Sequence, residues 1–312
     1  MITLKDLVEI SAPSGREKRI TEFITRELKA EVDEIVTNNI GNVIFVKRGN
    51  GKNLPKIALV AHVDEVGIVV RKVNYNKAYF IALYRANPLV LYGKKVVFEN
   101  GEIGLITTDK KDVTCLQLDD LFIDISGAKN VREGDFATYC PFFKKQGAFI
   151  YGKALDNRAG CYVLCSLISM LHDTNADLYF VFSVQEEVGL RGAEALLRLV
   201  HPDKIFSIDT TETTDEIRSG EGFTIKICDG GTIVSDELVR LIKDECKKNS
   251  KTYQLEILSS GKTDVAAVSF MQADIPVCAM SIPCRNMHSD SEIINEQDVD
   301  DLIEILYLIL KR

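Results

Sequence analysis

The 312-residue sequence lacks features that would place it in several large classes of protein. It has no apolar run that approaches the roughly 18 residues needed by a membrane-spanning helix. It has no excess of basic residues, because its formal net charge is −8. A general nucleic-acid-binding protein would instead carry a basic face. We therefore expect neither a membrane nor a nucleic acid as a partner.

The sequence also lacks the features of an exported protein. Residues 1–10 have an amphipathic helical pattern, without the basic segment and apolar segment of a signal peptide. The eight cysteines include no C-x-x-C pair and mostly lie in apolar stretches. We expect them to be reduced residues of the core, and we expect the protein to be cytoplasmic.

The apolar periodicity predicts an α/β protein. Runs such as Ile57–Val63 and Leu178–Val184 are apolar on both faces, which is typical of strands covered by helices on both sides. Further strand-like runs lie at 32–36, 42–46, 204–208, 253–258 and 276–282. Helical patterns lie at 4–10, 17–28, 159–171, 193–200, 236–247, 265–271 and 296–310. We predict a three-layer α/β/α domain with a central mixed sheet.

One long segment departs from this pattern. Between residues 69 and 150 the runs are short and alternating, with several glycines and little helical periodicity. Within it, Asn100-Gly101 separates two strand-like runs and predicts a type I′ hairpin. We predict that residues 69–150 form a small β-rich domain, inserted into a catalytic domain of residues 1–68 and 151–312.

Potential metal ligands follow four of the strand-like runs and begin one helix. They are His62 with Asp64, Glu186 with Glu187, Asp209, His288 and, at the helix, Asp156. Ligand crevices in open α/β sheets lie at the carboxyl ends of the strands, so these side chains are expected to meet. The chain has only four histidines, and two of them are in this set. The other two, His172 and His201, fall at predicted helix ends, where a surface role is expected.

Each of these residues has an ordinary explanation when it is taken alone. His62 fits a hydrogen-bonded core histidine, Asp156 a helix N-cap, Asp209 the cap of a turn, and His288 an exposed loop residue. Together these explanations require independent coincidences at one edge of a sheet. The five carboxylates would also repel one another, and two divalent ions would offset most of that charge.

The chemistry of the set favours particular metals. Imidazoles and carboxylates without cysteine suit a catalytic site for Zn²⁺, Co²⁺ or Mn²⁺ rather than a structural zinc site. In a two-metal site one carboxylate must bridge ions that lie roughly 3.5–4 Å apart. The set therefore predicts a pair of divalent ions.

Seven parts of the sequence resemble, in order along nearly the whole chain, the glutamyl/tetrahedral aminopeptidase family of dinuclear metallopeptidases. Some members of that family are named endoglucanase M or cellulase M-like. The matching parts are SAPSGRE (11–17), AHVDEVG (61–67), GKALDNRAGC (152–161), VQEEVGLRGA (184–193), Asp209, GKTDVAA (261–267) and SIPCRNMHS (281–289).

The resemblance implies an enzyme that removes N-terminal residues from short peptides with a free amine. His62 and Asp209 would hold one ion, Glu187 and His288 the other, and Asp156 would bridge both. The ions would be Zn²⁺ or Co²⁺, with Mn²⁺ as an alternative. The inserted β-rich domain would support self-association and shape the specificity pocket.

The resemblance also implies roles for the two remaining acids. Asp64 would orient the His62 imidazole and raise its basicity. Glu186 would be the general base for a metal-bridged water and would then pass the proton to the leaving amine.

The sequence departs from the family in places outside the metal centre. Arg85-Ala86-Asn87-Pro88 stands where the family usually has a Gly-Gly-Trp stretch, and this chain has no tryptophan. The inserted segment is short and has no clear Pro-Pro-His motif. Thr211-Glu212-Thr213 stands where the family often has a His-Ala pair.

Three other functions are alternatives to aminopeptidase activity. A deacylase or carboxypeptidase-type peptidase shares the H-x-D and Glu-Glu motifs, but such enzymes usually carry their second domain after the later ligands. Here the extra segment falls between His62 and Asp156, which favours the aminopeptidase. A glycosidase would leave the histidines without a role. A non-catalytic peptide-binding scaffold would not need the full set of chemical residues.

Overall fold

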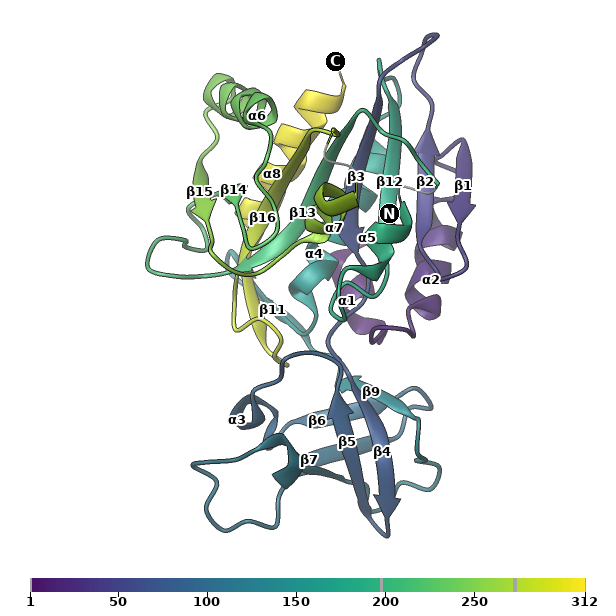
Figure 1. The fold of residues 1–312 in the computed structure, drawn as a ribbon, viewed down its shortest axis with the longest axis vertical. Coiled ribbons are helices and arrows are strands. Elements are labelled where there is room, and N and C mark those ends of the chain that lie inside the picture. Colours follow the sequence, from purple (N-terminus) through teal and green to yellow (C-terminus); the bar gives the residue numbers. More distant parts are fainter. Residues whose placement is uncertain (1, 197–198, 272–273, 312) are drawn as a thin grey trace.

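The computed structural model describes residues 2–196, 199–271 and 274–311. It consists of a large α/β part and a small closed barrel, which lies beyond the carboxyl end of strand β3 (Figure 1). The helix predicted over 193–200 begins earlier, as α5 (Arg191–Leu196), and residues 197 and 198 lie outside the described residues.

The large part is built on an 11-stranded mixed sheet. Its main path runs in the order β1 (Glu34–Thr37), β2 (Val43–Lys47), β12 (Asp177–Ser183), β3 (Lys56–His62), β13 (Lys204–Glu212), β16 (Val277–Arg285), β17 (Glu292–Asn295), β11 (Phe149–Gly152) and β10 (Phe143–Gln146). Two further strands, β14 (Phe223–Cys228) and β15 (Tyr253–Ile257), join through β16. The four central strands β12, β3, β13 and β16 are parallel to one another.

Helices cover both faces of this sheet. One face carries α1 (Leu4–Glu9), α2 (Lys18–Leu28), α4 (Leu155–Met170), α6 (Asp236–Lys248) and α8 (Glu296–Leu310), and the other carries α5 and α7 (Asp264–Met271). Successive residues of β2 point to opposite faces: Phe45 belongs to the core under the five helices, and Ile44 to the core that includes Val265 of α7. The predicted three-layer fold with a mixed sheet is confirmed.

The barrel closes in the order β4 (Ile68–Asn74), β5 (Lys77–Ala82), β8 (Phe122–Asp124), β7 (Ile103–Thr107), β6 (Lys95–Phe98) and β9 (Phe136–Tyr139). The short helices α3 (Pro88–Leu91) and η1 (Leu118–Asp120) lie in its connections. The barrel has its own hydrophobic core, separate from the two beside the sheet. Its strands span residues 68–139, while β10 and β11 belong to the large sheet. The predicted limits of the inserted domain, residues 69 and 150, stay a proposal.

The hairpin between β6 and β7 forms at the predicted place but with another turn. Gly101 has a φ of 88°, whereas Asn100 is not in the positive-φ region, so the type I′ prediction is wrong. Gly101 N donates to Phe98 O (2.9 Å), and Phe98 N donates to Glu102 O (2.9 Å), which closes a three-residue loop. The Asn100 side chain accepts from Glu102 N (3.0 Å) and donates to Asn130 O (3.0 Å). These two bonds hold Asn100 in its conformation.

A buried ion cluster joins the N-terminal segment to the end of β3 and the start of α4. Glu65 Oε1 accepts hydrogen bonds from Lys153 Nζ (2.7 Å), Arg158 Nη2 (3.4 Å) and Ala12 N (2.8 Å). The side chains of Lys153 and Arg158 are completely buried. Arg158 also donates to Ile10 O (2.9 Å). The cluster therefore holds the chain just after His62 and on either side of Asp156.

Glu65→Ala is expected to lower the free energy of unfolding by about 3–5 kcal/mol, because it leaves two buried cations without their carboxylate. Urea unfolding followed by circular dichroism measures the change. Glu34→Ala is the matched control, since Glu34 forms an ion pair with Arg48 at the surface. Such exposed pairs contribute about 0–1 kcal/mol. Equal losses in the two variants would contradict a stabilising role for the buried cluster.

Candidate metal centre

The parallel register of the central strands brings three chain segments to one level. His62 ends β3 directly opposite Ser183, which ends β12. On the other side of β3, Ser207 of β13 lies opposite Val60, so Asp209, two residues further on, is level with His62. This edge of the sheet faces the barrel, because β4 follows β3 after a short connection.

Asp209 differs in one respect from the prediction. The strand was expected to end at Ile208, but β13 continues to Glu212. It does so because β16 pairs with it residue by residue, from Asp209 opposite Ser281 to Glu212 opposite Cys284. Asp209 is therefore a buried residue within a strand rather than the cap of a turn.

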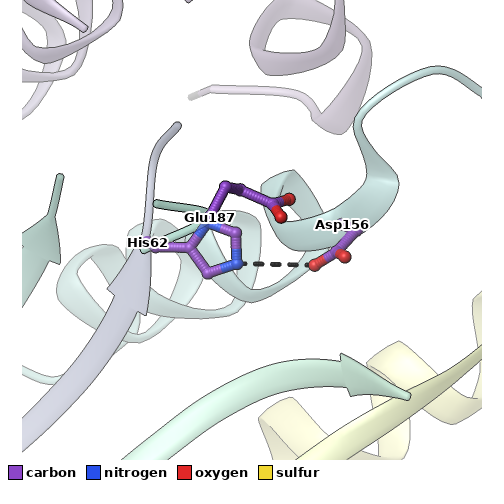
Figure 2. A group of neighbouring side chains, drawn as sticks. All are labelled: His62, Asp156 and Glu187. Carbon is purple, nitrogen blue, oxygen red and sulfur yellow. Dashed lines mark ion pairs between the residues drawn. The ribbon is translucent and has the colours of Figure 1, made fainter. Parts of the chain in front are cut away.

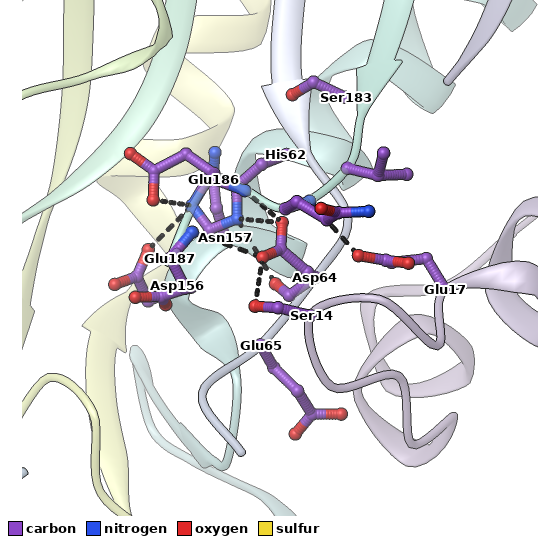
Figure 3. A network of polar contacts seen from close by, with 12 residues as sticks. Ser14, Glu17, His62, Asp64, Glu65, Asp156, Asn157, Ser183, Glu186 and Glu187 are labelled. Carbon is purple, nitrogen blue, oxygen red and sulfur yellow. Dashed lines mark hydrogen bonds and ion pairs between the residues drawn. The ribbon is translucent and has the colours of Figure 1, made fainter. Parts of the chain in front are cut away.

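The two adjacent glutamates follow β12 and are held by Asp64. Asp64 Oδ1 accepts from Glu186 N (3.0 Å), and Oδ2 accepts from Glu187 N (3.2 Å) and from Ser14 Oγ (2.6 Å) (Figure 3). Burial opposes ionisation of Asp64, but His62 and these donors hold its pKa below its usual value. Asp64 thus fixes the backbone of the turn that carries both glutamates.

Asp64 also lies against the inner side of the His62 ring. His62 Nδ1 is 3.2 Å from the Asp64 carbonyl oxygen and 3.4 Å from Asp64 Oδ1. This leaves Nε2 facing the other predicted ligands. The backbone carbonyl of Asp64 is nearer to the His62 ring than the Asp64 carboxylate is. The role of Asp64 in orienting the ring stays a prediction.

Asp156 lies between the two histidines. His62 Nε2 is 3.4 Å from Asp156 Oδ1, and His288 Nε2 is 3.2 Å from Asp156 Oδ2. Figure 2 shows the His62 ring pointing toward the Asp156 carboxylate, with Glu187 beside it. The residue does not cap α4, because Ala154 occupies the N-cap position. Among the described residues, no donor forms a hydrogen bond with the buried Oδ1 atom of Asp156.

The remaining predicted ligands, Asp209 and Glu187, each lie beside one of the two histidines. Asp209 Oδ1 is 3.6 Å from His62 Nε2, and Glu187 Oε2 is 3.2 Å from His288 Nε2. The structure thus brings all five predicted ligands together. Glu186 Oε2 lies 3.9 Å from His62 Nε2, and ligand atoms of His62, Glu186 and Asp209 all lie within 4.8 Å of one another. By geometry alone, Glu186 could also be a ligand.

The electrostatics of the site fit divalent cations. Burial would lower the pKa of His288, but Asp156 and Glu187 raise it to about 12. Burial likewise opposes the charge on His62, yet the surrounding carboxylates raise its pKa well above the usual value. Burial and the neighbouring acids raise the pKa of Glu186 well above that of an ordinary glutamate. Several buried acids in contact with one another are stabilised by nearby positive charge. The Asp156 Oδ1 atom accepts no hydrogen bond from the described residues, and imidazole and carboxylate groups suit a metal.

Two buried acids beside the site, Asp264 and Glu292, were not among the predicted site residues. Glu292, at the start of β17, accepts from Asp156 N (2.9 Å) and from His288 N (2.8 Å), so one carboxylate holds the backbone of two predicted ligands. Asp264, at the start of α7, accepts from Ser183 Oγ, and burial raises its pKa to about 6. The signal for Asp264 was its place in the GKTDVAA segment, whereas Glu292 lies outside the matching segments and had no such signal.

A cleft of about 430 Å³ opens onto the centre. Beyond the predicted ligands and Glu186, the residues that line it are Thr210, Thr211, Glu212, Thr214, Lys226, Leu258, Ser260, Gly261, Lys262, Thr263 and Met287. A substrate in this cleft would lie directly against the predicted ligands.

Several expectations about the rest of the chain can also be compared with the structure. His172 and His201 are exposed, as predicted. All eight cysteines are free thiols, and five of them are buried. A helix with both the length and the apolar character needed to cross a bilayer does not occur in the described parts of the chain.

The sequence matches one family model and a known relative over most of its length. The model of the M42 glutamyl aminopeptidase family matches residues 41–305. A putative aminopeptidase of Acetivibrio thermocellus is 37% identical over 320 residues, which cover 97% of this chain and 96% of the relative.

Solved structures agree with the sequence comparison. The aminopeptidase APDkam598 of Desulfurococcus kamchatkensis is 28% identical, with a TM-score of 0.93 over 99% of this chain and 93% of the other. The TET1 peptidase of Pyrococcus horikoshii, which can assemble into a tetrahedron or a large octahedral shell, is 30% identical, with a TM-score of 0.88 over 98% of each chain.

Proposed function

This chain belongs to the M42 glutamyl aminopeptidase family and is a metallo-aminopeptidase; from that premise we propose that it removes N-terminal residues from short peptides, with two bound divalent ions and Glu186 as general base. The observation that carries the proposal is the position of Asp156, with one carboxylate oxygen facing His62 and the other facing His288. A shared carboxylate of this kind is what a two-metal site requires.

The proposed ligand sets are those that the family resemblance implies, and the distances between the side chains are compatible with them. His62 and Asp209 hold one ion, Glu187 and His288 hold the other, and Asp156 bridges the pair. The contacts of His62 with Asp209 (3.6 Å) and of His288 with Glu187 (3.2 Å) support this division. Two imidazoles and three carboxylates, without a thiolate, suit Zn²⁺ or Co²⁺, with Mn²⁺ as an alternative.

When bound, the ions polarise the scissile carbonyl and lower the pKa of a bound water from 15.7 towards about 7. The chain supplies the proton transfer. Glu186 lies at the cleft with its side chain 12% exposed, and Asp64 fixes its backbone. It accepts the proton of the attacking water and then gives it to the leaving amine. Burial raises the pKa of Glu186, which suits an acid that must both take up and release a proton.

We also propose self-association through the barrel. The TET1 relative can assemble into a tetrahedron or a large octahedral shell, and the barrel of this chain has exposed apolar side chains at Ile81, Ile103 and Leu105. Light scattering tests this proposal: a particle several times the 34.8 kDa chain mass is expected, and a monomer at micromolar concentration would contradict it.

A peptide panel tests the proposed activity. The protein is expected to release N-terminal residues from unblocked peptides and to leave their N-acetylated counterparts intact. Removal of metal with a chelator should stop the release, and added Zn²⁺ or Co²⁺ should restore it. Release of acetate would indicate a deacylase, and release of C-terminal residues from both sets would indicate a carboxypeptidase. No release with metal present would indicate a peptide-binding scaffold.

A further inference from the structure

The loop between β16 and β17 carries His288 and differs from the segments that carry the other predicted ligands. The side chain of His288 is 39% exposed, whereas that of His62 is 2% exposed. His288 and Asn286 both have a positive φ, 61° and 57°, which non-glycine residues adopt only at a cost. Such a conformation persists when surrounding contacts hold it. The position of this ligand therefore depends on what anchors the loop.

The α/β part provides one group of anchors. Glu292 accepts a hydrogen bond from His288 N (2.8 Å). Glu212, at the end of β13, accepts from Asn286 N (3.2 Å) and from Met287 N (3.1 Å). These bonds fix the loop backbone from the side of the sheet.

The barrel provides a second group, at three separate points. Tyr139 of β9 donates its hydroxyl to His288 O (3.3 Å). Tyr84, two residues after β5, meets the His288 imidazole edge-on, with ring centroids 5.5 Å apart and an angle of 73°. Lys94, next to β6, has its Nζ atom 2.8 Å from Asp290 Oδ1. The ligand loop (residues 286–291, between β16 and β17) thus contacts the barrel through the backbone and the ring of His288 and through the side chain of Asp290.

The two tyrosine hydroxyls also lie 3.3 Å from each other. Tyr139 is buried in the barrel core, where a phenylalanine would fill the same apolar space without a hydroxyl. A buried hydroxyl needs a hydrogen-bond partner, and this one uses the carbonyl of a predicted metal ligand. Burial raises the pKa of both tyrosines, so both hydroxyls keep their protons at neutral pH.

We propose that the barrel positions a metal ligand: Tyr139, Tyr84 and Lys94 hold the loop so that the His288 imidazole faces Asp156 and Glu187. The inference rests on the proposed function, because it takes His288 as a ligand. It assigns the barrel a part in forming the metal centre, in addition to any part in assembly. The ion held by Glu187 and His288 depends on the barrel contacts, and the ion held by His62 and Asp209 does not.

Metal titration of the full-length protein tests this proposal. Tyr139→Phe and Lys94→Met each remove one barrel contact, and Co²⁺ added to the metal-free protein reports two dissociation constants and a visible absorption spectrum. We expect the site that His288→Ala abolishes to lose affinity by about 10–100-fold, as is typical when a partner that orients a ligand is removed. The other constant should stay within about twofold of wild type.

Two barrel variants serve as matched controls. Tyr79→Phe alters a tyrosine whose ring packs on Phe122 within the barrel (centroids 6.2 Å apart), and Lys77→Met removes an ion pair with Asp109 within the barrel. Neither residue reaches the ligand loop, so both constants and the cobalt spectrum should match wild type. The melting temperature of each metal-free variant shows whether it is folded.

His288→Ala separates failure of this proposal from failure of the proposed function. It should abolish one of the two binding events. If it leaves both intact, His288 is not a ligand, and the ligand assignment and the inference fall together. If it abolishes one while Tyr139→Phe and Lys94→Met both bind as wild type, only the positioning role is overturned. Equal weakening of both sites in the barrel variants would also overturn it, because it would indicate a general structural effect.

Discussion

Glu186→Gln is expected to abolish most peptide hydrolysis while both metal ions stay bound. Glutamine has nearly the same shape as glutamate, so the hydrogen bond from residue 186 N to Asp64 and the fold of the turn should be preserved. The amide cannot accept the proton of the attacking water. Loss of general-base catalysis typically lowers kcat by about 10²–10⁴. Steady-state kinetics on an unblocked peptide, together with metal analysis of the same sample, measures both effects.

Glu187→Gln is the matched control, because it changes the adjacent residue in the same way. Glu187 faces His288 at 3.2 Å and is a proposed ligand, so its variant should lose metal as well as activity. A Glu186→Gln enzyme with the wild-type rate would rule out Glu186 as the base. Loss of an ion from Glu186→Gln would instead make Glu186 a ligand together with His62 and Asp209, a grouping that the distances allow.

Asp156→Ala is expected to have the largest effect on metal binding. Asp156 faces both histidines and is the proposed bridge, so its removal would take one ligand from each ion and leave the two ions without a shared ligand. Partners that only orient a ligand contribute about 10–100-fold in metal affinity, and a shared ligand should exceed that. Equilibrium dialysis with metal analysis should find fewer than two ions per chain, and hydrolysis should fall with the metal content.

Asp298→Ala controls for the loss of a buried aspartate as such. Asp298 is buried at the start of α8 and accepts hydrogen bonds from Gly220 N (2.7 Å) and Gly222 N (2.9 Å), away from the predicted ligands. This variant should lose stability but keep the wild-type metal content. An Asp156→Ala protein that retains both ions with wild-type affinity would show that Asp156 does not bridge them.

The parts of the fold that depend on local pattern could be predicted from the sequence. The apolar stripe of residues 296–310 predicted a helix with the bounds of α8, Glu296–Leu310. The uniformly apolar run ending near His62 predicted β3, because a short run of that composition is typical of a strand covered on both sides. Since buried parallel strands present their carboxyl ends at one edge, the approximate place of the metal centre followed from the same patterns.

The parts that depend on distant pairing could not be predicted. β17 has only four residues and is a strand because β11 and β16 pair with it, so Glu292 had no local signal. The hydrogen bond from Asp156 N to Glu292 spans 136 residues of sequence. The extension of β13 beyond Asp209 likewise requires β16.

The contacts between the barrel and the ligand loop could not be predicted from the sequence either. Tyr84 and Tyr139 lie in alternating runs that resemble any small β structure, and nothing near them in sequence indicates His288. Their role depends on where the barrel docks beside the sheet. That position is set by the fold of the whole chain, and only the three-dimensional structure reveals it.

Anomalous X-ray diffraction at the zinc absorption edge, from crystals of protein loaded with Zn²⁺, would locate the bound ions directly. Two peaks per chain are expected, one beside His62 and Asp209 and one beside Glu187 and His288, with the Asp156 carboxylate between them. A single peak at this site, or peaks that Asp156 does not contact, would contradict a two-metal centre built on that residue.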